Sequence, residues 1–196
     1  MTFYHIIFGF LLLAAFREFL RSLNDQNLAQ IWESLTLMLL IFSDVIYTSH
    51  VIEEKKKPYT VVLKFIDLGS FILLSLAVFA LDTSEHNLFH IPAGQHLQKQ
   101  NWIAIFWFLI VLYWLLLIFW NHSGQMYAGL PNNNRWIPRV QPGLLVPFLV
   151  MFAVAALWPA SAFAYGCRIV IAILAALYFV FYKSHVLDKM PRQGES

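Results

Sequence analysis

Three ionisable residues stand inside two long apolar stretches of this sequence. Asp44 lies in the stretch over residues 31–52, and Lys64 and Asp67 lie in the next one, over residues 59–81. An unpaired charge at the centre of a bilayer costs about 2.5–3.5 kcal/mol on insertion scales. Such residues therefore face a protein interior or a water-filled cavity, usually beside a partner.

The spacing of these residues predicts that they meet. The two stretches form a hairpin, and counted from Lys55, Asp44 lies 11 residues back and Asp67 lies 12 residues forward. Since a helix rises about 1.5 Å per residue, the two carboxylates reach nearly the same depth, halfway through the bilayer. Lys64 is one helical turn from Asp67, and Tyr47 is one turn from Asp44. We expect a buried Asp44–Lys64–Asp67 cluster with Tyr47 beside it.

Such a cluster favours one class of function. Two carboxylates and one ammonium in a low dielectric favour the binding of a proton, a cation or water. The sequence therefore predicts a small channel or an ion- or proton-coupled transporter. The alternative is a non-catalytic membrane subunit or anchor that scaffolds a larger complex, because buried Asp–Lys pairs also hold helices together. The sequence leaves both open.

Two further groups are candidate sites. His86 and His90 stand at i, i+4 with Glu85 beside them, a spacing at which two histidines on a helix could share zinc or copper. A solvated loop is the simpler interpretation of that segment. Glu33 and Arg168 lie at the outer ends of the second and sixth apolar stretches, where they could form an ion pair.

The sequence carries no known catalytic motif. It has no HExxH, no nucleophile elbow and no paired cysteines, since Cys167 is its one cysteine. The sequence therefore argues against an enzyme without deciding the question, and a membrane enzyme that uses the external histidine loop is a third, weaker alternative. The sequence leaves any cofactor unknown.

The composition requires a membrane around the elements that position these residues. Hydrophobic residues make up 60% of the 196, and charged residues 12%, against about 25% charged in soluble domains. A soluble protein of this size could not bury so much apolar surface in one core. The net charge of +2 is too small to indicate nucleic acid as a partner.

Six apolar stretches approach the roughly 20 residues that a membrane-spanning helix needs. We expect an all-α polytopic bundle with one transmembrane domain over residues 1–183 and a cytoplasmic tail over 184–196. The stretch over 102–120 has no charged residue and is expected to face lipid or another subunit, and Pro142 is expected at a helix boundary. The six stretches are 2–20, 31–52, 59–81, 102–120, 143–158 and 165–182.

The basic residues predict the orientation. With six spans, eight lysines and arginines fall on the side of the termini and four on the other side. The positive-inside rule then places both termini in the cytoplasm. We expect the chain itself to lie in the plasma (inner) membrane. The expected partners are the lipid bilayer and either further copies of the chain or another membrane protein. The first group is Lys55, Lys56, Lys57, Arg135, Arg139, Lys183, Lys189 and Arg192, and the second is Arg17, Arg21, Lys99 and Arg168.

Overall fold

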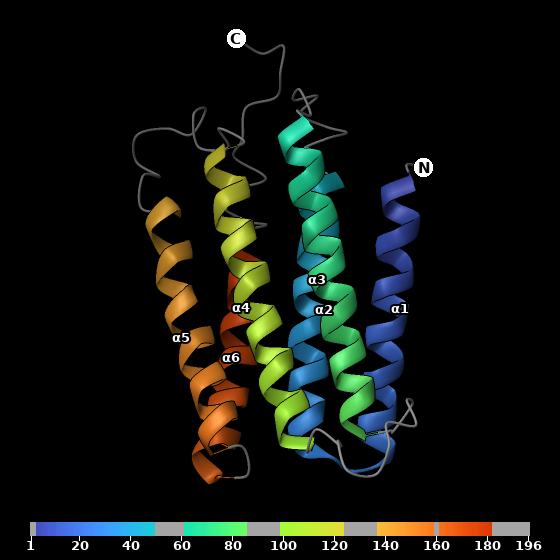
Figure 1. Cartoon of the computed structure of the whole chain (residues 1–196), viewed down its shortest axis with the longest axis vertical. Helices are drawn as coiled ribbons and strands as arrows, with labels where there is room; N and C mark the ends of the chain where they lie inside the picture. Colours follow the sequence, from blue (N-terminus) through green and yellow to red (C-terminus); the bar gives the residue numbers. More distant parts are fainter. Residues whose placement is uncertain (1–2, 50–60, 86–98, 124–136, 159–160, 182–196) are drawn as a thin grey trace.

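The computed structural model is all-helical in the residues that it describes, which are 3–49, 61–85, 99–123, 137–158 and 161–181 (Figure 1). The predicted all-α fold is thereby confirmed, with six helices in this part of the chain. They are α1 (Phe3–Asn24), α2 (Leu28–Ser49), α3 (Val61–Glu85), α4 (Lys99–Ser123), α5 (Ile137–Leu157) and α6 (Ala162–Phe181).

Four of these helices are long and apolar enough to cross a membrane. The qualifying stretches lie in α2, α3, α4 and α6, and the apolar part of α5, Pro142–Leu157, is shorter. Helix α1 carries Arg17, Glu18 and Arg21 in its second half. These properties are those of a helical membrane protein, whereas six spans stay a prediction.

The helices pack as an elongated bundle (Figure 1). Helix α1 lies at one edge against α2 and α3, and α5 lies at the other edge against α4 and α6. The closest neighbours are α3 with α4, α1 with α2, α4 with α5, and α2 with α6. Each of the three inner helices α2, α3 and α4 therefore has protein on more than one side.

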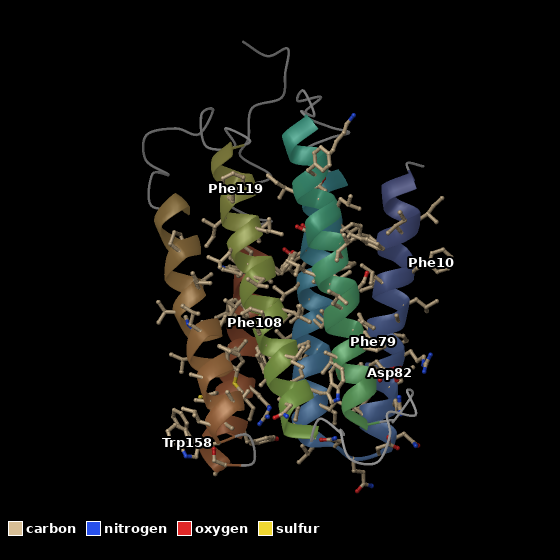
Figure 2. The ribbon with its side chains drawn as sticks, in the orientation of Figure 1. Phe10, Phe79, Asp82, Phe108, Phe119 and Trp158 are labelled. Carbon is tan, nitrogen blue, oxygen red and sulfur yellow. The ribbon has the colours of Figure 1, made fainter. Side chains whose placement is uncertain are left out.

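Helix α4 corrects one prediction. Its aromatic run was expected to face lipid or another subunit, but Phe106, Trp107, Tyr113 and Trp114 are each at most 1% exposed and form the centre of the core. The polar groups of tyrosine and tryptophan rings need hydrogen-bond partners when they leave water, and an inner helix can supply them. The other face does point outward, where Phe108 and Phe119 are 44% and 56% exposed (Figure 2).

Two helix boundaries also differ from the prediction. Helix α1 continues to Asn24, because its charged residues form ion pairs along the helix instead of ending it. Helix α5 begins at Ile137, so Pro142 lies inside it together with Pro147. Membrane helices tolerate such prolines because neighbouring groups and small local adjustments satisfy the freed backbone carbonyls.

Candidate functional site

Asp44 and Asp67 lie near the same end of the bundle, and each is closer to an end of its helix than predicted. Asp44 is five residues before the end of α2, and Asp67 is six residues after the start of α3. These intervals correspond to about 8 and 9 Å along the helix axes. The two residues therefore lie at similar distances from these helix ends, and their depth in a bilayer stays a prediction.

The two carboxylates converge on one tyrosine of α4. Tyr113 is hydrogen-bonded to Asp44, and Asp67 and Tyr178 are close enough to act on it electrostatically. A phenol is the only possible donor to an ionised carboxylate in this pair, so the hydroxyl of Tyr113 donates and Asp44 accepts. We call Asp44, Asp67, Tyr113 and Tyr178 the acid group; it draws on α2, α3, α4 and α6.

The acid group is shielded from its surroundings. Asp44, Asp67 and Tyr178 are 7–8% exposed, and Tyr113 is 1% exposed. The Oδ2 atom of Asp67 is buried and accepts no hydrogen bond within the described residues, although Asp67 has other interactions. The group is therefore a set of titratable side chains held in a medium of low dielectric.

Close packing holds these side chains in place. Trp114 lies with its ring centroid 5.0 Å from Tyr178 and 5.0 Å from Phe148, so that α4, α5 and α6 meet beside the group. On the opposite side, a Cβ atom at Gly69 would come within 3.2 Å of a Leu116 methyl group. The glycine lets α3 approach α4, which brings Asp67 toward Tyr113.

The predicted lysine is not part of this arrangement. Lys64 is the fourth residue of α3, and its side chain is exposed. The predicted buried Asp44–Lys64–Asp67 cluster is therefore wrong for the lysine, which can extend along the helix toward the membrane surface from this first turn. Tyr47 belongs to α2, but its side chain is outside the described residues.

The predicted pair of Glu33 and Arg168 is brought together at the other end of the bundle. The Nε atom of Arg168 donates to Oε1 of Glu33 over 2.8 Å, and the two side chains are 3% and 2% exposed. Trp107 donates from Nε1 to the same oxygen over 3.2 Å. Sequence reasoning missed Trp107, although an indole N–H inside an apolar helix needs an acceptor.

A second charged group at this end joins α1 to α3. Arg21 contacts Asp82 over 2.8 Å and Glu18 over 3.4 Å. Glu18 is buried, and Asp82 lies in the last turns of α3, at the lower end of the bundle in Figure 2. In the sequence Arg21 counts only as a charge for orientation, because sequence spacing does not show that α1 lies against α3.

An apolar layer separates the acid group from the Glu33–Arg168 pair. On α2, Leu37 and Ile41 lie between Glu33 and Asp44 on one helix face and are 0% exposed, as is Ile110 of α4. The 11 residues from Glu33 to Asp44 span about 17 Å. In the described part of the bundle, these two buried polar groups are therefore separated by apolar side chains along this face of α2.

The metal prediction lies largely outside the described residues. His86 and His90 are not described, and Glu85 ends α3 without a described side chain. That prediction stays untested.

Two apolar grooves open on the outer surface. One of 420 Å³ lies between α1 and α2 and includes Gly9 and Met38. The other, of 560 Å³, lies between α5 and α6 and includes Gly166 and Cys167. Neither is lined by Asp44 or Asp67, so both grooves are suited to lipid chains or to another helix and do not lead to the acid group.

No family model matches the chain, and comparisons with curated proteins and with solved structures likewise found no match.

Proposed function

We propose that this chain is a small integral membrane protein that moves a proton or a small cation, with the acid group as its ion-binding site. One observation carries this proposal: two buried carboxylates from different helices lie near the same buried tyrosine, Asp44 hydrogen-bonded to it and Asp67 within electrostatic range. Buried charges are costly unless they are compensated, and a bound proton or cation compensates a pair of carboxylates. The two carboxylates then titrate as a unit and not as independent groups.

The burial of the acid group favours a small bound species. Asp44, Asp67, Tyr113 and Tyr178 are each at most 8% exposed. A proton or a monatomic cation needs less space among such buried side chains than an organic solute does.

The topology that accompanies this proposal has six spans, with α1 and α5 crossing the membrane beside the four longer apolar helices. Both termini and the connection between α2 and α3 then lie in the cytoplasm. The acid group is near the cytoplasmic surface, and the Glu33–Arg168 pair is near the outer surface. A single bundle of this size holds only a narrow path, and a wide pore would need several copies.

Flux measurements on the purified chain test this proposal. The protein is reconstituted into sealed liposomes, and gradients of H⁺, Na⁺ or K⁺ are imposed in separate experiments. We expect the wild-type protein to dissipate at least one gradient and Asp44→Asn to fall to the rate of empty liposomes. Asp25→Asn, which removes a partly exposed carboxylate at the other end of the bundle, is the matched control and keeps the wild-type rate. Wild-type rates equal to those of empty liposomes for all three ions contradict the proposal.

The second candidate is a membrane subunit or anchor. It is favoured by the apolar layer of Leu37, Ile41 and Ile110, which leaves no path for an ion as the bundle is packed. A subunit of this kind would show no flux, would purify together with another membrane protein, and would lose that partner in Asp44→Asn. The mass of the purified complex shows whether another chain is bound. A bound partner without flux indicates a subunit or anchor, and flux indicates a transporter.

A further inference from the structure

We infer that Glu33, Arg168 and Trp107 form a gate that closes the acid group to the membrane side opposite the α2–α3 connection. The inference rests on the proposed function, because a gate has meaning only if an ion reaches the acid group. It assigns a positioning role to three side chains that do not touch the ion site.

The position of the acid group makes access unequal from the two sides. Asp44 is 16 residues from the start of α2, and Asp67 is 18 residues from the end of α3. These intervals are about 24 and 27 Å along the helices, against about 8 and 9 Å on the other side. Any barrier to exchange with the distant side must therefore lie along this longer part of the bundle.

Two barriers occupy that part. The first is the apolar layer of Leu37, Ile41 and Ile110, which excludes water where it is closed. The second is the Glu33–Arg168 pair, which lies one helical turn beyond Leu37 on α2. Because Glu33 compensates the charge of Arg168 in the closed pair, this second barrier is steric and holds α2 and α6 together.

The geometry of the second barrier suits a closure that can be reversed. Oε1 of Glu33 accepts from Arg168 over 2.8 Å and from Trp107 over 3.2 Å, so one oxygen atom holds α2, α4 and α6 together. A buried ion pair adds little stability compared with apolar side chains of similar volume. An ion pair at this position is therefore better explained if α2, α4 and α6 have to move apart and come together again than by stability alone.

Cysteine accessibility tests the gate without measuring flux. Ser70 is 5% exposed and lies one turn from Asp67 toward the distant side, so Ser70→Cys is a nearly isosteric probe beside the acid group. The probe is placed in a Cys167→Ser protein in sealed vesicles, and membrane-impermeant thiol reagents of positive and of negative charge are added in separate experiments to either side, so that opening of the gate is distinguished from a change in local charge. Asn24→Cys, an exposed position in the last turn of α1, identifies the distant side.

With the gate intact, we expect the probe to be unreactive from the distant side. Glu33→Gln removes the charge that holds Arg168 and should raise the labelling rate from that side at least tenfold. Glu18→Gln is the matched control, because it removes a buried carboxylate at the same end but between α1 and α3, and should leave the rate unchanged.

Two further variants keep the test decisive if Glu33→Gln folds poorly. Trp107→Phe keeps the ion pair and removes one hydrogen bond to Oε1, so it should raise the labelling rate by a smaller factor. The exchange Glu33→Arg with Arg168→Glu restores the pair and should restore protection. Labelling of the probe from the distant side in the unaltered gate, or continued protection in both Glu33→Gln and Trp107→Phe, overturns the inference. Since no flux enters these readouts, failure of the gate is distinguishable from failure of the proposed function.

Discussion

At the scale of single residues, the site depends on Tyr113 as much as on the two carboxylates. The sequence indicated Asp44 and Asp67 because charge is rare in apolar stretches. It could not indicate Tyr113 or exclude Lys64, because that choice depends on which face α3 turns toward α4. Glu33 and Arg168 could be proposed as partners, since both are charged and lie at corresponding ends of their stretches.

The hydrogen bond between Tyr113 and Asp44 leads to a first prediction. Hydrogen bonds to charged groups contribute about 1.5–3 kcal/mol. If that energy holds the ion site in its working geometry, Tyr113→Phe should lower the flux rate by at least about tenfold. Tyr165→Phe removes a hydroxyl that Trp32 contacts over 3.2 Å at the other end of the bundle, and it should keep the wild-type rate. Equal rates in the two variants would show that the Tyr113 hydroxyl has no role in transport.

The Glu33–Arg168 pair leads to a prediction about stability. Removing one member of a buried pair leaves the other charge uncompensated and costs about 3–5 kcal/mol. Glu33→Gln and Arg168→Gln should each lower the unfolding temperature in detergent, while the double variant should recover most of the loss. Additive losses in the double variant would mean that the two side chains are not coupled.

At the scale of helices, the number and type of the elements could be predicted from apolar length alone. Their ends could not, because α1 and α5 continue through residues that usually stop a helix. Ion pairing carries α1 past Arg17, and the membrane environment allows α5 to include Pro142. The burial of α4 was also beyond the sequence, since an aromatic run fits a lipid-facing wall and an inner helix equally well.

The contact between α3 and α4 depends on Gly69, and this predicts a selective loss of stability. A β-branched side chain at this position has to displace Leu116, and overpacking of this kind typically costs about 1–3 kcal/mol. Gly69→Val should therefore lower the unfolding temperature and reduce flux, because α3 and α4 hold Asp67 and Tyr113. At Gly9 a Cβ atom meets nothing within 4 Å, so Gly9→Val is the control and should have a much smaller effect. Similar losses in both would contradict a close α3–α4 approach.

At the scale of the whole molecule, the described helices hold the acid group near one end and two ion-paired groups near the other. The proposed topology places the acid group near the cytoplasm. It predicts that Asn24→Cys and Ser161→Cys, each in a Cys167→Ser background, react with an impermeant thiol reagent added outside intact cells. A tag at either terminus should be protected from outside. Labelling of only one of the two cysteines would mean that α1 or α5 does not span the membrane.

The proposed transport requires that Asp44 and Asp67 act together as one ion site. The most direct measurement compares the flux of wild-type protein with that of Asp44→Asn, Asp67→Asn and the double variant in liposomes. Residues that act as a unit give strongly non-additive losses, so each single variant should lose as much flux as the double variant. If instead each single variant keeps a measurable part of the flux and the losses multiply in the double variant, the two carboxylates act independently and the shared ion site does not exist.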